Sequence, residues 1–229
     1  MGLKEPGLRG SLRNVSVGIR AIPDSAISQY DAQSAFASGD DGTTISAWPD
    51  ELGLADATGG SPTVRENGIN NNRSLEFDAV DDILQTGAYS SAKNQPITIA
   101  SVFQAFNTDE RIRIHDGDSN IFQTEIEPPE YSFSADASTV NGGSPDTNPH
   151  IAVAIFDGAN SSFRLDGAEL FTGDVGSNSL DGFTIGASRI DSLFWDGYLG
   201  ELVIYDDVLS GEQLSEEEQR LSDKWGVTV

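Results

Sequence analysis

The chain contains 229 residues, of which 37 are acidic and 13 are basic, and it has no cysteine, so its formal net charge is −24. The length suits one all-β domain, because single sandwiches and barrels run to about 200–250 residues. The composition excludes disulfides, thiolate metal sites and a cysteine nucleophile; the charge argues against a nucleic-acid ligand, and the lack of about 18 consecutive apolar residues argues against membrane insertion.

The chain begins with a basic segment, although the rest of the sequence is acidic. Residues 1–25 contain four cations and few apolar residues in any regular pattern. The cations are Lys4, Arg9, Arg13 and Arg20. Because opposite charges steer association, we predict that this segment is an N-terminal arm that binds a sister subunit or another acidic partner. It lacks the apolar run of about 7–15 residues of a secretory signal peptide, so no signal peptide is expected.

Short strand-like runs follow along the chain. Residues 97–106 (ITIASVFQAF) are rich in β-branched and aromatic residues, and residues 150–156 (HIAVAIF) form a second apolar run that ends at the turn dipeptide Asp157-Gly158. Further strands are expected at 162–165, 169–171, 183–186 and 195–205, with glycine-containing turns between them. Many short strands at a spacing of roughly 8–12 residues are typical of a sandwich or jelly roll.

One helix is predicted near the end of the chain. Ser210 is its expected N-cap, with Gln213 completing a capping box, and Leu209 and Leu214 match a hydrophobic staple. Gly226 is expected to end it. Acidic residues in its first two turns favour the helix dipole, namely Glu212, Glu216 and Glu217. Its apolar face consists of Leu214, Leu221 and Trp225, which indicates a short amphipathic helix lying on the sandwich.

Three segments resemble, in order, the laminin-G-like, concanavalin A-like jelly rolls. Residues 28–32 (SQYDA) and 45–50 (ISAWPD) are similar to the opening strand and W-x-D turn of that family. Residues 75–84 (LEFDAVDDIL) resemble its F-D-G-x-D-D-x-L signature, with alanine at the glycine position. Residues 197–206 (GYLGELVIYD) and 224–226 (KWG) resemble its final strand and its K-W-G ending.

The resemblance covers residues 26–229, which we predict to form one domain. It implies an all-β fold, an antiparallel two-sheet jelly-roll sandwich with a short C-terminal amphipathic helix. Trp48, Phe77 and Trp225 are then expected in the core, and Asp78 and Asp81 as hydrogen-bonding turn residues. The family includes sugar-binding modules, adhesion domains, glycoside hydrolases and parts of viral particles, so function has to be argued from sites.

The dispersed acidic charge indicates a saline habitat. Only three residues are lysine, and the acidic residues are spread along the chain. Self-repulsion at this net charge is screened within about 3 Å at 1 M salt. We therefore predict a protein of a halophilic archaeon or of a haloarchaeal virus.

A catalytic pair of carboxylates is the first candidate site. Glycosidases need two carboxyl groups about 5–9.5 Å apart, and Glu125 and Glu127 would lie on one face of a strand. The family's catalytic members carry an additional aspartate between such residues, which is absent here, and Pro128-Pro129 would interrupt the strand. We therefore expect no enzymatic activity.

Two further candidate sites concern calcium and a sugar. Asp116, Asp118 and Asn120 place oxygen atoms at alternate positions, as in a calcium loop, so calcium is the one cofactor that the sequence suggests. Stacking on a sugar ring requires exposed aromatic residues. The candidate platforms are Tyr89, Tyr131, Phe194 and Trp195, each of which could instead belong to the core.

Together these features predict a non-catalytic structural and binding subunit of a haloarchaeal virus particle, such as a tail fibre, spike or capsid turret. We expect it on the virion, in a homo-oligomer and in contact with other virion subunits through the arm, with a host-surface glycan or glycoprotein as ligand. Two alternatives remain open from the sequence: a free carbohydrate-binding or adhesion module of a halophilic archaeon, and a glycoside hydrolase.

Overall fold

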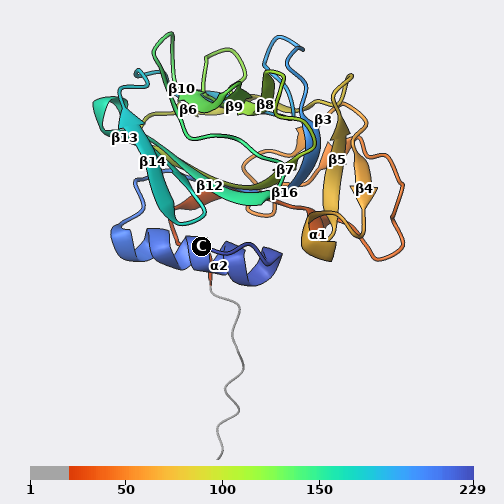
Figure 1. Ribbon diagram of the computed structural model, residues 1–229. Helices are drawn as coiled ribbons and strands as arrows, with labels where there is room; N and C mark the ends of the chain where they lie inside the picture. The colour runs from red at the N-terminus through yellow and green to blue at the C-terminus, as the bar shows by residue number, and fades with distance from the viewer. Residues whose placement is uncertain (1–20) are drawn as a thin grey trace, which may run out of the picture.

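A computed structural model describes residues 21–229, which form two antiparallel β-sheets packed face to face with one long helix against the outer side of one sheet (Figure 1). This architecture confirms the predicted two-sheet sandwich with a C-terminal helix. The cationic residues predicted to form the arm lie outside the described residues. Neither helix among residues 21–229 is long and apolar enough to cross a membrane.

Sheet A contains eight strands and carries the long helix. Its order is β14 (Ala168–Gly173), β13 (Ser161–Leu165), β12 (Pro149–Phe156), β7 (Ile97–Ala105), β16 (Asp196–Tyr205), β5 (Ser74–Asp78) and β4 (Thr63–Arg65), with β1 (Ala26–Asp31) also paired to β16. β7 is buried along nearly its whole length, because the core lies on one side of it and the helix layer on the other. This double burial explains its nearly continuous apolar sequence.

Sheet B is the opposite layer. Its order is β11 (Thr139–Gly142), β10 (Glu130–Ser134), β9 (Gln123–Glu127), β8 (Ile112–Asp116), β15 (Leu180–Ile185), β6 (Leu84–Lys93), β3 (Ala57–Thr58) and β2 (Ala47–Trp48). A one-turn helix, α1 (Ala32–Ala35), follows β1. The core between the sheets is rich in aromatic residues and includes fully buried Trp48, Phe77 and Trp195.

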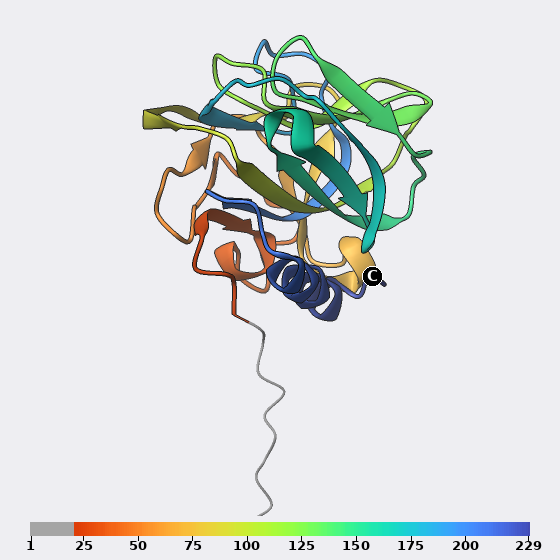
Figure 2. The same cartoon turned by 90° about the vertical axis from the view of Figure 1, so that its left-hand side faces the viewer.

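The long helix, α2 (Gly211–Trp225), begins and ends where the sequence predicts. Ser210 accepts from the Gln213 amide, the Gln213 side chain accepts from the Ser210 amide, and Gly226 closes the helix in a left-handed conformation. Leu221 and Trp225 pack on apolar residues of the outer face of sheet A. Figure 2 shows this layer with α2 viewed nearly end-on, along its axis.

A buried network of ionic groups joins α2 to sheet A, and the sequence analysis did not anticipate it. The Arg220 guanidinium lies 2.8 Å from Glu201 of β16 and 2.7 Å from Glu217 of its own helix. Glu201 also accepts from the Lys224 ammonium at 2.7 Å and from the Trp225 indole at 2.9 Å. Glu217, which the sequence predicts to favour the helix dipole, is fully buried and takes part in this network.

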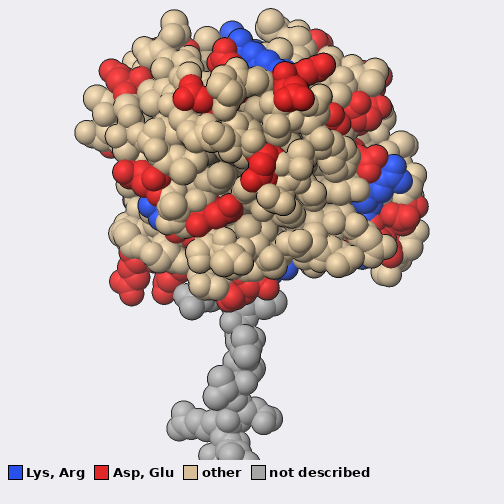
Figure 3. All heavy atoms as spheres, viewed as in Figure 1, with Lys and Arg blue, Asp and Glu red and all other residues tan. Residues whose placement is uncertain are grey.

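Acidic side chains are scattered over the visible surface, and the few basic ones lie beside acidic ones (Figure 3). Residues 21–229 contain 36 acidic and nine basic residues, and no basic face balances the acidic side chains in this view. Repulsion between such exposed charges is long-ranged in dilute buffer, whereas the buried ion pairs are screened much less by salt.

Stability is therefore expected to rise with salt. Raising KCl from 0.1 to 2 M should increase the midpoint of thermal unfolding by at least about 5 °C, equivalent to about 1–2 kcal/mol for a domain of this size. Circular dichroism at both salt concentrations measures this shift. A variant with Asp40, Asp41, Glu212 and Glu216 changed to the amides should show a smaller shift. A midpoint that stays constant or falls with salt contradicts the expectation.

Candidate functional site

The outer face of sheet B carries a set of polar side chains on three neighbouring strands. Successive side chains of a strand point to opposite faces, so Ile126 and Phe133 enter the core while Glu125, Ser132 and Ser134 face outward. Glu125 lies opposite Arg113 of β8 on one side and opposite Ser132 of β10 on the other. Strand pairing therefore brings together polar residues from three separate parts of the sequence.

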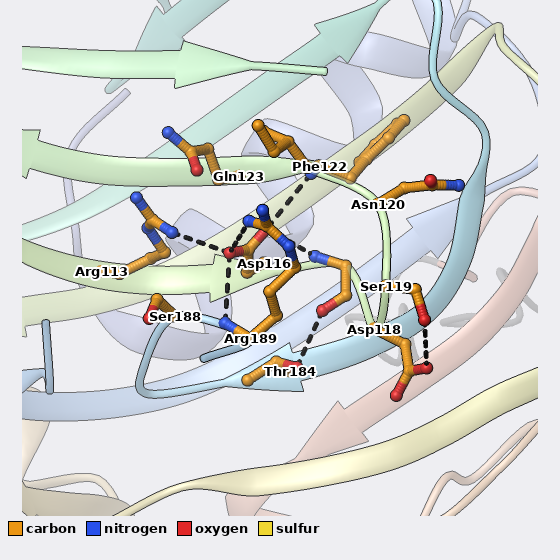
Figure 4. A network of polar contacts seen from close by, with 12 residues as sticks. Arg113, Asp116, Asp118, Ser119, Asn120, Phe122, Gln123, Thr184, Ser188 and Arg189 are labelled. Atoms are coloured by element: carbon orange, nitrogen blue, oxygen red, sulfur yellow. Dashed lines mark hydrogen bonds and ion pairs between the residues drawn. The ribbon is translucent and has the colours of Figure 1, made fainter. Parts of the chain in front are cut away.

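Arginines and carboxylates alternate across this face. Glu125 accepts from Arg111 at 2.7 Å and from Arg113 at 2.7 Å, and Arg113 also donates to Asp116 at 2.7 Å. Arg189 completes the row at 3.3 Å from the same oxygen of Asp116, as the close view in Figure 4 shows. We call these five residues the charge ladder. It begins and ends with an arginine, and its three central members are almost completely buried.

A cavity of about 290 Å³ opens beside the ladder, and we call it the Arg113 pocket. Its lining includes Arg111, Arg113, Gln123, Ser134 and Arg189. Residues 187–192 project as a small loop held by pairing of Ser188 with Ser192. Four of its residues line the pocket, so this loop forms part of the cavity wall.

Two serine hydroxyls on this face have no partner within the described part of the chain. The Oγ atoms of Ser132 and Ser134 are buried and make no hydrogen bond there. Ser134 lines the Arg113 pocket. A buried hydroxyl without a partner costs about 1–3 kcal/mol. A polar ligand in the pocket would supply the missing partner for Ser134.

The candidate catalytic carboxylates are tied to arginine. Glu125 is fully buried and accepts hydrogen bonds from Arg111, Arg113 and Gln123. Arg111 Nη2 lies 2.7 Å from Glu125 and 3.6 Å from Glu127, so one guanidinium touches both carboxylates. Pro128 and Pro129 form the tight turn between β9 and β10. Glu125 and Glu127 therefore belong to one ion cluster that is held together by Arg111.

The candidate calcium ligands are not brought together. Both Asp116 oxygens are engaged, one by the two arginines and the other by the amides of Gly117 and Phe122. In Figure 4 Asp118 and Asn120 extend away from Asp116. The amides of this loop instead donate to the carboxylate of Asp181. A carboxylate from β15 therefore organises the loop that was predicted to hold a cation.

A different acidic group does converge, at the turn after β5. Oxygen atoms of Asp78, Asp81 and Asp82 lie within 4.8 Å of one another. Asp78 accepts from the Val80 amide and Asp82 accepts from the Asp78 amide, so two of the three shape the turn, as predicted for Asp78. Burial raises the pKa of Asp82.

The aromatic candidates divide between core and surface. Tyr131 and Trp195 are fully buried, so neither can present a ring face to a sugar, and this part of the prediction is corrected. Tyr89 is half-buried and packs against the core, with its hydroxyl buried and unpaired in the described chain. Phe194 is half-buried and lines a second cavity beside the Arg113 pocket. Its ring therefore faces a cavity.

Sequence reasoning missed the arginines of the ladder. Residues 21–229 contain only nine cationic residues, and three of them are Arg111, Arg113 and Arg189. That scarcity, together with the alternation of polar and apolar residues in β8 and β9, is the signal that could have indicated a polar outer face. The position of Arg189 in the row depends on a distant loop and carries no such signal.

Comparisons with known proteins concern the fold. No family model matches the chain, and no curated protein matches it. Among solved structures, Trypanosoma rangeli sialidase matches with a TM-score of 0.65 at 15% identity, covering 91% of this chain and 35% of the sialidase. Domain 4 of AbnA, a GH43 extracellular arabinanase from Geobacillus stearothermophilus solved in complex with arabinotriose, matches with a TM-score of 0.60 at 13% identity, covering 83% of this chain and 97% of that domain.

A third match, the HCR/D F1240A mutant, has a TM-score of 0.63 at 10% identity and covers 90% of this chain and 55% of that structure. The chain thus spans about a third of the sialidase and nearly all of the arabinanase domain. These likenesses show that the chain shares a β-sandwich fold with these three structures.

Proposed function

We propose that this domain is a non-catalytic carbohydrate-binding module and that its ligand lies in the Arg113 pocket on the outer face of sheet B. The observation that carries the proposal is the buried hydroxyl of Ser134, which has no hydrogen-bond partner among residues 21–229 and lies beside fixed arginine and amide groups. Sugar sites need a few well-placed polar groups that orient hydroxyls. The ion pairs of the ladder hold these groups in place before a ligand arrives, which lowers the entropic cost of binding.

The structural neighbours add support of a general kind. One is a domain solved with arabinotriose, and another is a sialidase that has also been solved with sialic acid. The non-catalytic part of the proposal is supported by the position of Glu125 and Glu127, whose carboxylates both lie near the guanidinium of Arg111. The role as a virion subunit, the halophilic source and the homo-oligomer stay predictions from the sequence.

The test removes one hydroxyl. Ser134→Ala should weaken saccharide binding by about 2- to 13-fold, which corresponds to a hydrogen bond of about 0.5–1.5 kcal/mol. The same change should leave the free energy of unfolding constant or raise it, because the hydroxyl has no hydrogen-bond partner in the described part of the chain. Isothermal titration with glucose, cellotriose, arabinose, arabinotriose and sialic acid measures binding, and urea unfolding measures stability.

Ser28→Ala is the matched control. Its Oγ is likewise buried and unpartnered in the described chain, but it lies on β1 of sheet A. This variant should bind as the unmodified protein does. If none of the saccharides binds, or if both variants weaken binding equally, the Arg113 pocket is not the site.

A further inference from the structure

A second cavity adjoins the Arg113 pocket on the same side of the molecule. It has a volume of about 260 Å³ and is lined in part by Asn107, Glu110, Phe194 and Asp196. Arg111 and Leu193 line both cavities. The two hollows are therefore neighbours that meet at these two side chains.

The volumes show what the two hollows can hold. Pockets for small molecules and cofactors span about 300–1,000 Å³. Each cavity alone, at about 260 and 290 Å³, falls just below that range, whereas the two together lie within it. A single small ring would suit either cavity, and a longer ligand is needed to occupy both.

The second cavity has its own chemistry. The half-buried ring of Phe194 offers an apolar surface, and the side chains of Glu110 and Asp196 stand at the same cavity. A sugar ring has apolar C–H faces and a rim of hydroxyls, so it would pack on the phenyl ring while donating hydrogen bonds to the carboxylates. Among the described residues, no aromatic side chain lines the first cavity, whose polar groups are arginine, amide, hydroxyl and the carboxylate of Asp136.

We infer that the ligand is an oligosaccharide chain of at least two sugar units that crosses Arg111 and Leu193, with one unit in the Arg113 pocket and the next against Phe194. This inference rests on the proposed function and extends it from one sugar to a chain. Arg111 is the junction: its Nε and Nη2 are held by Glu125, and its side chain remains 43% exposed between the two cavities.

The experiment compares sugars of one series that differ only in length. Glucose, cellobiose and cellotriose, and in parallel arabinose and arabinotriose, are titrated into the full chain by calorimetry. The trisaccharide of the series that binds should bind at least tenfold more tightly than its monosaccharide. Phe194→Ala should lower the affinity for the trisaccharide by about five- to tenfold. It should therefore reduce the ratio of the trisaccharide affinity to the monosaccharide affinity.

Two further variants keep the result interpretable. Glu110→Gln changes an exposed side chain of the second cavity and should also reduce the ratio, even if Phe194→Ala proves too unstable to study. Phe106→Ala removes an exposed aromatic ring that does not line either cavity, and it should leave both affinities unchanged. Equal affinity for the monosaccharide and the trisaccharide overturns this inference alone, whereas no binding of any saccharide overturns the proposed function as well.

Discussion

Replacing Arg220 by methionine is expected to lower the free energy of unfolding by about 3–5 kcal/mol, because it leaves buried charges without a partner. Arg220 is 4% exposed and binds two carboxylates, Glu201 and Glu217, which are both fully buried. Lys224 and Trp225 would still reach Glu201, but Arg220 is the only cation within 4 Å of Glu217 among the described residues. Urea unfolding followed by tryptophan fluorescence measures the change.

Arg65→Met is the matched control on sheet A. Arg65 forms an ion pair of similar geometry with Glu76, but the two side chains are 36% and 25% exposed. Exposed ion pairs contribute about 0–1 kcal/mol to stability, so the free energy of unfolding of this variant should fall by less than about 1 kcal/mol. A loss of similar size in the two variants would contradict the view that burial makes the α2 network costly to break. Replacing Arg220 and Glu217 together by apolar residues should restore part of the lost stability, because Glu201 then keeps Lys224, Trp225 and Gln29 as partners.

Mild acid is expected to destabilise the protein through His115. Its ring lies in the core beside Phe183, and burial lowers its pKa from 6.5 to about 4. A histidine with a depressed pKa must be neutral in the folded state, so its contribution to stability is complete above pH 6.5 and is lost as the pH falls toward 4. This shift in pKa lowers the free energy of unfolding by about 3 kcal/mol between pH 6.5 and pH 4. Urea unfolding at pH 7 and pH 4.5 measures the loss, and His115→Phe should reduce it by about 2–3 kcal/mol.

His150 provides a control of opposite sign. Burial lowers its pKa, but hydrogen bonds to Asp166 at 2.7 Å and Asp146 at 3.0 Å and the charges of these carboxylates outweigh burial and raise it. Its contribution is therefore complete below pH 6.5 and is lost as the pH rises through its folded-state pKa. His150→Gln should cost more stability at pH 6 than at pH 8. If His115→Phe leaves the acid sensitivity unchanged, carboxylates alone account for it.

Sequence alone determined the local elements of this fold. The capping box of Ser210 and Gln213 and the turn at Asp166-Gly167 depend on backbone conformations and hydrogen bonds within a few residues. The structure confirms both: Asp166 and Gly167 have positive φ angles, and β13 and β14 pair on either side of them. The order of the strand-like runs and the C-terminal helix likewise follow from local residue patterns, which do not depend on how the strands pair into sheets.

Only the tertiary structure decided where the candidate site lies. A strand's alternation shows that Arg113 and Glu125 share a face with neighbouring polar residues, but it does not show which loop covers that face. Arg189 arrives from a loop more than 70 residues away, and Arg220 meets Glu201 only after α2 packs on sheet A. A charged residue in a sequence is by default solvated, and a distant segment has to exclude water before it becomes part of a buried ladder. For the same reason, sequence patterns could not separate the core rings of Tyr131 and Trp195 from the ring of Phe194, which faces a cavity.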